Sequence, residues 1–223
     1  MLIYAHRGAS YDFPEMSLAA YTAAIAQGAD GFECDIRLTK DGVIICWHDD
    51  DFLRIANSPL VVAKSTHHQL HSEYPVLAFE KLLNLAIKNK KNLAIETKHP
   101  VPTSGEIESA LLKMLEAKKS EIQVSGIQIA IMSFSWLATW RVRKSGWDCV
   151  YLVAHPISRF FAITPILGPW VALLRDKPNK FAGKRLFVWT VNEEPEIRAM
   201  LNRDIEVLIT DRPGYAREII NQK

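Results

Sequence analysis

Short apolar runs alternate along the chain with segments in which apolar residues recur every three or four positions. The short runs predict buried strands, and the three-to-four spacing predicts helices that pack by one face. The expected strands are residues 2–6, 31–38, 93–98, 128–133, 149–153, 171–174, 186–191 and 207–210. The expected helices are residues 17–27, 79–90, 106–118, 136–144, 194–202 and 215–221. Eight strands with intervening helices predict a (β/α)8 TIM barrel, with an open doubly wound sheet as the alternative.

The chain is expected to form a single domain over residues 1–223. No linker, repeat or low-complexity tract divides it. Its length suits one barrel at the short end of the range of that fold. With 48% apolar and 23% charged residues it has the balance of an ordinary globular protein, and a chain of this size can bury enough surface to need no disulfides.

Charge and cysteine content exclude several classes of protein. A formal net charge of +2 is too small to argue for a nucleic-acid partner. The three cysteines, an odd number, lie in apolar runs and are expected to be buried, reduced thiols of a cytoplasmic protein. Neither a basic segment nor a long apolar one opens the chain, so no secretory signal is expected.

The most apolar stretch, residues 160–174, does not predict a membrane span. Pro165, Gly168 and Pro169 interrupt it, and it is shorter than the roughly 20 residues that a spanning helix needs. A core strand with a loop is therefore favoured, and stable membrane insertion is not expected.

Carboxylates alternate with apolar residues along the second predicted strand. Glu33, Asp35 and Arg37 share one face, and the apolar side chains between them are expected to pack on the helices. The carboxylates then face the barrel interior or its mouth, where two desolvated carboxylates need a cation, a shared proton or water. A divalent metal is favoured over a structural charge cluster. All-oxygen ligands favour Mg²⁺, Ca²⁺ or Mn²⁺ over zinc.

An Asp-Gly pair at positions 41 and 42 predicts a tight hairpin directly after this strand. If the two residues flanking the pair face each other, the register sets Asp35 opposite His48. Directly opposite residues share a sheet face about 5 Å apart. The hairpin is therefore expected to bring an imidazole beside the carboxylates.

Further polar side chains end the neighbouring strands. Glu96 and Lys98 share a face at the carboxyl end of the third strand, where barrel enzymes place their chemistry. Two interpretations stay open for them: a buried ion pair, or a third metal ligand beside a cation that binds phosphate. His6 ends the first strand and is followed by Arg7, whose guanidinium suits phosphate binding.

This series of motifs resembles the glycerophosphodiester phosphodiesterase family over nearly the whole chain. The matching motifs, in chain order, are His6-Arg7-Gly8, Pro14-Glu15, Gly28-Ala29-Asp30, Glu33-x-Asp35, Thr39-Lys40-Asp41-Gly42, His48-Asp49, Glu96-Thr97-Lys98, Ser133-Phe134, Trp189-Thr190-Val191-Asn192 and Ile209-Thr210-Asp211-Arg212-Pro213. The resemblance implies a barrel with a small insertion after the second strand, at about residues 49–75. It also implies metal-dependent hydrolysis of a small glycerophosphodiester to sn-glycerol 3-phosphate and an alcohol.

The resemblance implies a role for each candidate residue. Two histidines would serve as general acid and base, His6 and His48. Three carboxylates would hold one divalent cation, Mg²⁺ or Ca²⁺ or else Mn²⁺: Glu33, Asp35 and Glu96. Three side chains would contact the substrate, with Arg7 and Lys98 on the phosphate and Trp189 beside the glycerol or the leaving group. Histidine suits both proton roles because its unperturbed pKa lies near neutrality.

Three features depart from the family pattern. Met16 stands where the family usually has asparagine, which changes the loop before the first helix. The stretch 158–184 is atypical, and an apolar lip formed by Phe160, Phe161 and Trp170 would favour a lysophospholipase D-type activity as the alternative. A non-catalytic barrel that binds phosphodiesters is disfavoured because both histidines and all three carboxylates are present. The histidines at 67, 68 and 71 are expected in a solvated turn rather than a second metal site.

Overall fold

The computed structural model describes residues 1–101, 104–155, 163–175, 181 and 183–222 of the chain. Its barrel strands are β1 (Leu2–His6), β2 (Gly31–Leu38), β6 (Asn92–Thr97), β7 (Ile129–Ser133), β8 (Asp148–Val153), β9 (Ile166–Pro169), β10 (Arg185–Val188) and β11 (Val207–Thr210). The surrounding helices are α1 (Leu18–Ala26), α4 (Phe79–Asn89), α5 (Glu106–Ala117), α6 (Lys119–Ser125), α7 (Trp136–Val142), α8 (Glu194–Leu201) and α9 (Pro213–Asn221).

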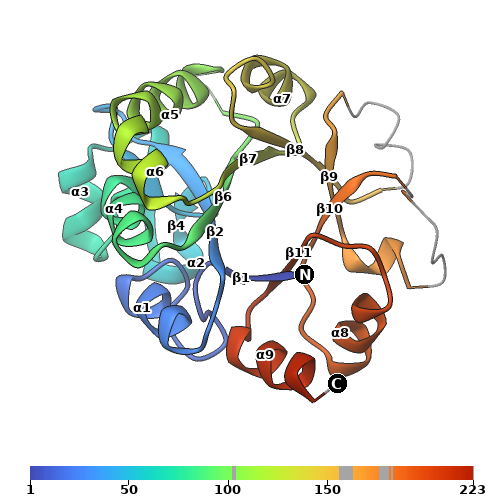
Figure 1. Cartoon of the computed structure of the whole chain (residues 1–223). Coiled ribbons are helices and arrows are strands. Elements are labelled where there is room, and N and C mark those ends of the chain that lie inside the picture. Colours follow the sequence, from blue (N-terminus) through green and yellow to red (C-terminus); the bar gives the residue numbers. More distant parts are fainter. Residues whose placement is uncertain (102–103, 156–162, 176–180, 182, 223) are drawn as a thin grey trace.

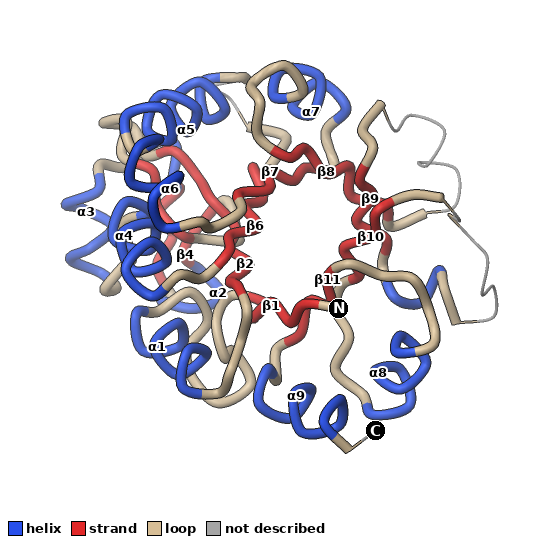
Figure 2. Tube along the Cα trace, viewed as in Figure 1, coloured by secondary structure: helices blue, strands red, loops and turns tan. Residues whose placement is uncertain are grey.

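These strands run parallel and close into a barrel, with the helices forming an outer ring (Figure 1). The closure is made by β1, which pairs with β2 on one side and with β11 on the other (Figure 2). The predicted (β/α)8 barrel is thus confirmed, and the open sheet is excluded because no strand of the ring is left at an edge.

Apolar residues fill two layers on either side of the strands. In β2, Phe32, Cys34 and Ile36 are fully buried against side chains of the outer helices, including Leu82 of α4. A second cluster, including Tyr4, Met132 and Phe187, fills the barrel interior. Since residues alternate along a strand, the polar side chains of β2 must face the interior, as the sequence pattern predicted.

The predicted sixth strand at residues 171–174 is wrong. The strand is β9, five residues earlier, and η3 (Val171–Leu173) is a short 3₁₀ helix. Gly168 is part of β9. A larger residue would not fit at this position, because a Cβ there would come 2.5 Å from Cδ2 of Leu152 on the adjacent strand. Close packing between strands, rather than a chain break, therefore explains this glycine.

The predicted hairpin register is wrong by one residue. β3 (Ile44–Cys46) pairs antiparallel with β2 so that Ile36 faces Cys46, and the amide of Trp47 donates to the carbonyl of Asp35 at 3.0 Å. The loop holds three residues instead of two, because Thr39 pairs with the residue after Gly42 and that glycine takes φ +79°. His48 follows as the chain leaves the ladder.

The insertion after the hairpin forms a small layer of its own beside the barrel. It contains β4 (Asp51–Phe52), α2 (Leu53–Ala56), β5 (Ser58–Val61), η1 (Val62–Lys64) and α3 (His67–Glu73). Its core includes Trp47 stacked on Phe52, with ring centroids 4.1 Å apart. The three histidines lie on α3, so the expected turn is wrong. The helix begins at a capping box made by Thr66 and Gln69.

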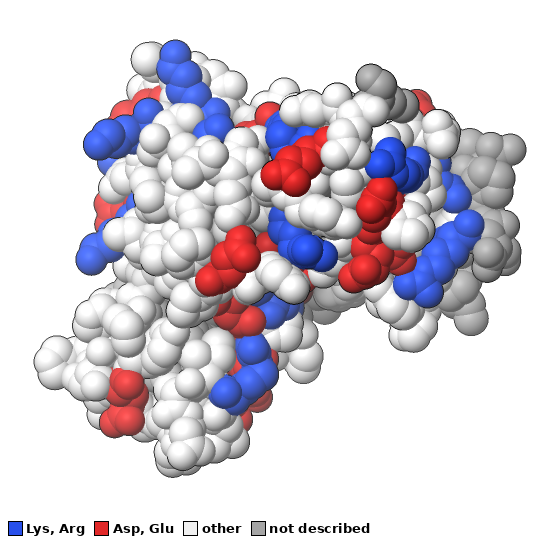
Figure 3. Space-filling model, turned by 90° about the horizontal axis from the view of Figure 1, so that it is seen from below, with Lys and Arg blue, Asp and Glu red and all other residues white. Residues whose placement is uncertain are grey.

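The surface charges, the thiols and the lengths of the helices each bear on an expectation drawn from the sequence. Figure 3 shows the side of α1, α8 and α9, where acidic and basic side chains are interleaved without a continuous basic area. Cys34, Cys46 and Cys149 are buried and free, as predicted. No helix within the described residues is both long enough and apolar enough to cross a bilayer.

Candidate active site

Strand register brings the predicted carboxylates together at the carboxyl ends of β1, β2 and β6. In the parallel ladders His6 lies beside Glu33, and Asp35 lies beside Glu96. The carboxylates of Glu33, Asp35 and Glu96 each offer an oxygen within 4.8 Å of the others, and all three residues are buried. Within the described ranges no other group of His, Cys, Asp or Glu side chains is arranged to hold a metal ion.

Two cations partly neutralise this acidic cluster. Lys98 Nζ lies 2.7 Å from Glu96 and 3.2 Å from Asp35, and Arg7 Nε lies 2.9 Å from Asp35. Burial would raise the pKa of the Asp35 carboxyl, but Lys98 and Arg7 hold it at about 2. The buried ion pair, the first of the two interpretations of Glu96 and Lys98, is therefore present, and it lies within the acidic cluster.

The other two carboxyls respond to the same surroundings in the opposite direction. Burial, followed by the charge of Asp35, raises the pKa of Glu33 well above its ordinary value. The same two causes raise the pKa of Glu96 to about 7. A site in which three carboxyls share so little solvation favours one additional positive charge.

One atom of the cluster leaves room for a metal. Asp35 Oδ2 is buried and accepts no hydrogen bond, because Arg7 Nε lies 2.9 Å away in an ion pair but is poorly aligned for one. A buried carboxylate oxygen without a hydrogen bond is costly, and a divalent cation is a group that would satisfy it. The all-oxygen set of Glu33, Asp35 and Glu96 is compatible with such a cation.

His6 is held by a carboxylate from the far end of the chain. Its Nδ1 lies 2.6 Å from Asp211 Oδ1, whereas its Nε2 faces Glu33 at 3.9 Å. Asp211 is itself fixed by hydrogen bonds from the Ser10 hydroxyl at 3.0 Å and the Asn192 amide at 2.5 Å. With Nδ1 directed at Asp211, Nε2 is the nitrogen presented to the cluster.

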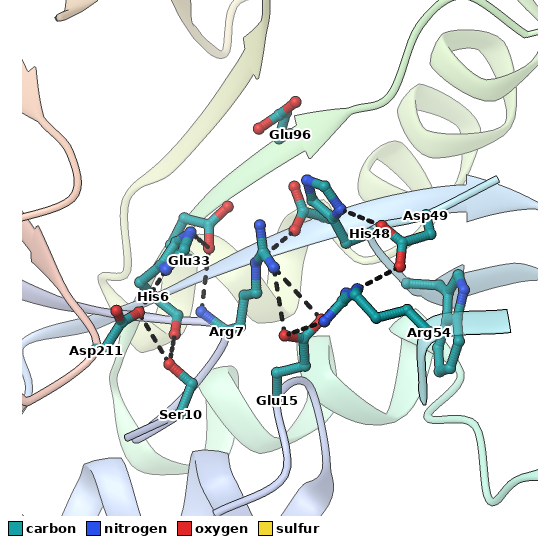
Figure 4. Close-up of polar contacts among 12 residues, drawn as sticks. His6, Arg7, Ser10, Glu15, Glu33, His48, Asp49, Arg54, Glu96 and Asp211 are labelled. Carbon is teal, nitrogen blue, oxygen red and sulfur yellow. Dashed lines mark hydrogen bonds and ion pairs between the residues drawn. The ribbon is translucent and has the colours of Figure 1, made fainter. Parts of the chain in front are cut away.

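His48 has an equivalent arrangement built from the insertion. Its Nδ1 lies 2.6 Å from Asp49 Oδ1, and Arg54 of α2 donates to the other Asp49 oxygen at 2.6 Å (Figure 4). Arg54 also donates to Glu15 at 2.6 Å. Burial lowers the pKa of His48, and the charges of Lys98 and Arg7 lower it further against the opposing effect of Asp35.

Glu15 joins these two halves of the site, because it also accepts from Arg7 at 3.3 Å. The loop that carries it depends on unusual backbone angles: Arg7 has φ +57° and Met16 has φ +54°. Met16 is 3% exposed, and its amide donates to the Arg7 carbonyl at 2.8 Å. The methionine that departs from the family pattern is therefore packed in the outer core.

Trp189 forms one wall of a cavity that also includes His6, Glu33 and Glu96, above a floor of apolar barrel side chains. The Trp189 indole donates to the Gly168 carbonyl at 2.6 Å and meets the Phe134 ring edge-on at 5.5 Å. Trp170 lies beside it and is 44% exposed. Phe160 and Phe161, the other members of the expected lip, lie outside the described residues.

The structure also brings in residues to which the sequence had assigned no role. Asp211 and Asn192 lie in motifs that matched the family, so their position in the sequence was a usable signal. Ser10 and Arg54 lie outside every matching motif, and only the folded geometry reveals them.

The fold and site together define a barrel hydrolase whose histidines flank an acidic cluster at the carboxyl ends of the strands. The profile of the Glycerophosphoryl diester phosphodiesterase family matches residues 6–146, and the chain belongs to that family. It is therefore a phosphoric diester hydrolase with glycerophosphodiester phosphodiesterase activity.

The chain is similar to a curated relative in sequence and to two solved structures in fold. The chain is 29% identical to a probable glycerophosphodiester phosphodiesterase 1 of Mycobacterium tuberculosis, over 96% of this chain and 90% of the relative. The structure of a glycerophosphodiester phosphodiesterase from Thermotoga maritima matches at TM-score 0.79 and 24% identity, covering 98% of both chains. An Oleispira antarctica phosphodiesterase, solved with the product sn-glycerol-3-phosphate, matches at TM-score 0.84 and 18% identity, over 99% of this chain and 97% of that one.

Proposed function

We propose that the chain hydrolyses small glycerophosphodiesters to sn-glycerol 3-phosphate and an alcohol, with His6 and His48 as a proton-transfer pair. The observation that carries this proposal is the symmetry of the two histidines. Each directs Nδ1 to a carboxylate at 2.6 Å, and each lies next to the acidic cluster. A general acid and a general base on one phosphate need this arrangement.

The chain's own residues supply the proton transfers. Asp211 and Asp49 keep a proton on Nδ1 of each histidine, so that Nε2 accepts or donates at the reacting phosphate. One histidine removes the proton from the attacking water, or from a glycerol hydroxyl that first forms a cyclic phosphate which water then opens, and the other protonates the departing alkoxide. Each carboxylate also stabilises the imidazolium that forms, because the two charges lie within hydrogen-bond distance.

The three carboxylates would hold one divalent cation, Mg²⁺, Ca²⁺ or Mn²⁺. When bound, such a cation supplies positive charge for the non-bridging oxygens of the phosphate. Arg7 and Lys98, each in an ion pair with Asp35, add to that charge and bind the phosphate. Trp189 would line the glycerol side, and the product seen in the Oleispira antarctica phosphodiesterase supports a glycerol 3-phosphate product.

We infer that residues 1–223 act as one domain and that the protein works in the cytoplasm. The test of the proposed function is turnover of glycerophosphocholine by this protein. EDTA should abolish release of sn-glycerol 3-phosphate, and Mg²⁺, Ca²⁺ or Mn²⁺ should restore it. Full turnover by a chelated sample would contradict the metal requirement. Calorimetric titration of the cation into an Asp35→Asn variant gives a second readout, with weaker binding expected whatever the activity.

The exposure of Trp170 beside Trp189 favours a second candidate, a lysophospholipase D-type activity. An apolar rim would accept the acyl chain of a lysophospholipid, so this substrate should be turned over at least as efficiently as glycerophosphocholine. A Trp170→Ser variant should shift the preference back toward glycerophosphocholine. An unchanged preference in a folded variant would remove this candidate and leave the main proposal intact.

A further inference from the structure

Helix α7 turns its large apolar side chains to solvent and its small ones to the barrel. Trp136, Leu137 and Trp140 are 42%, 53% and 48% exposed, whereas Ala138 and Val142 are 1% exposed. Trp140 lies four positions after Trp136 and three after Leu137, so the three exposed residues share one face. A surface helix normally turns its large apolar side chains to the core and its polar ones to solvent. An exposed apolar face of this kind therefore indicates an interaction surface.

The same face becomes basic at the end of the helix. Arg143 and Lys144 are exposed, and the Arg143 guanidinium lies 5.5 Å from the centre of the Trp140 ring. No aspartate or glutamate occurs between residues 122 and 147. The positive charge of this segment therefore has no acidic partner within it.

We propose that this α7 face, defined as Trp136, Leu137, Trp140, Arg143 and Lys144, docks on bilayers that contain anionic lipids. Tryptophan is favoured at the boundary between acyl chains and headgroups, because its ring is apolar and its N–H is polar. Exposed basic residues beside such rings are attracted to anionic headgroups. The contact is peripheral, since the face belongs to one short helix of the outer ring and the turn that follows it (Figure 1).

The position of α7 links this surface to the site. The helix follows β7, and Phe134 between the two elements packs edge-on against Trp189 in the wall of the cavity. The apolar face thus begins close to the catalytic end of the barrel. Docking would bring that end near lipids and their phosphodiester headgroups.

A second copy of the chain fits this face less well than a bilayer does. A two-fold contact sets a patch against itself. Arg143 and Lys144 would then approach their own copies, with no carboxylate from the same segment to separate them. Anionic headgroups provide the complementary charge that a second copy lacks.

Co-sedimentation with vesicles of phosphatidylcholine, with and without phosphatidylglycerol, tests the proposal. EDTA is present throughout, so the outcome does not depend on hydrolysis or on the proposed function. Binding to the mixed vesicles is expected, and it should weaken with salt. Trp136→Ser with Trp140→Ser, and separately Arg143→Glu with Lys144→Glu, should each weaken it by at least about tenfold.

Val124→Ser is the matched control, because Val124 is 89% exposed on α6, away from this face. It should sediment as the unmodified protein does. The charge variant keeps the test valid if the tryptophan variant does not fold, and turnover of glycerophosphocholine by both should be unchanged. Absent vesicle binding, or binding unaffected by either variant, overturns the proposal. Ultracentrifugation gives one more outcome. If the protein does not bind lipid but forms a dimer that only the tryptophan variant loses, the α7 face binds a second copy of the chain, and the membrane proposal is overturned.

Discussion

His6 Nδ1 and Asp211 Oδ1 lie 2.6 Å apart although the two residues are separated by 205 positions in the sequence. The contact exists because β1 and β11 pair at the point where the barrel closes, with Ala5 beside Thr210. A histidine at the end of one strand therefore receives its carboxylate from the end of the next strand around the ring. The pairing that closes the barrel is therefore also what orients the imidazole of His6.

Asp211→Asn should lower kcat by a factor between about 10² and 10⁴, because an amide can favour the wrong tautomer of His6. KM should change much less, since the acidic cluster and Arg7 are untouched. Steady-state kinetics on glycerophosphocholine measures both. Asp148→Asn, at the opposite end of the barrel in an ion pair with Arg185, is the control and should retain near-normal kcat.

His6→Ala and His48→Ala should each reduce turnover by about 10² to 10⁴, the usual contribution of one proton-transfer group. The unmodified enzyme should show a bell-shaped pH profile, and each variant should lose one limb of it. Because burial and nearby cations lower the pKa of His48, the limb that depends on its neutral form should extend toward acidic pH. A variant with both limbs intact would remove that histidine from the proposed role.

Arg54→Ala should lower the free energy of unfolding at neutral pH by about 1 kcal/mol, since both of its ion pairs are partly exposed and so weak. Burial would raise the pKa of Glu15 and of Asp49, but Arg54 helps to lower both. The pKa of Glu15 lies below its ordinary value of 4.5, and the pKa of Asp49 lies below its ordinary value of 3.8. Stabilisation from a lowered carboxyl pKa is present above the unfolded pKa and disappears as pH falls through the folded one.

The difference in free energy of unfolding between Arg54→Ala and the unmodified protein should therefore become smaller as the pH falls below the ordinary pKa values of these two carboxyls. Urea unfolding at a series of pH values measures it. Arg198→Ala is the matched control, because Arg198 forms one exposed ion pair, with Glu194, and one exposed hydrogen bond, to Gln222, so its loss should lower the free energy of unfolding by less. A gap that stays constant with pH would show that the two carboxylates do not depend on Arg54.

Gly168→Ala should destabilise the barrel by about 1–3 kcal/mol, the usual cost of overpacking, because the new Cβ would meet Leu152 Cδ2 at 2.5 Å. Combining it with Leu152→Val should cost less than the sum of the two single changes, since the smaller side chain makes room. Strict additivity in thermal or urea unfolding would argue that the neighbouring strand does not exclude a side chain here. Gly126→Ala is a control without a steric clash, because a Cβ there meets nothing within 4 Å. Any destabilisation that it causes comes from backbone strain, since Gly126 has φ +75°.

Much of this fold was predictable from local pattern, because strand alternation and helix periodicity reflect burial directly. The sixth strand was not, since Gly168 and Pro169 resemble a chain break, and only the neighbouring Leu152 explains the glycine. The hairpin register failed for a related reason. An Asp-Gly pair fits a two-residue or a three-residue loop, and the hydrogen bonds of Thr39 decide between them.

The acidic cluster could be predicted because each carboxylate lies on a strand whose inward face the apolar pattern defines. The partner of His6, and the contact that ties the insertion to the first loop, could not be placed in that way. Asp211 depends on ring closure, and the pair between Arg54 and Glu15 depends on how the insertion folds back over the barrel. Both are contacts between distant segments, which periodicity does not encode.

The seam between β1 and β11 has a consequence for a chain that is still being synthesised. A polypeptide completed only as far as α8 already contains both histidines, the acidic cluster, Arg7 and Lys98, yet the carboxylate that orients His6 is missing. With the proposed role of His6, catalytic competence would therefore arrive with the final strand of the ring instead of growing with length. Turnover would then report completed folding, since a nascent or clipped barrel that ends before β11 lacks the carboxylate beside His6.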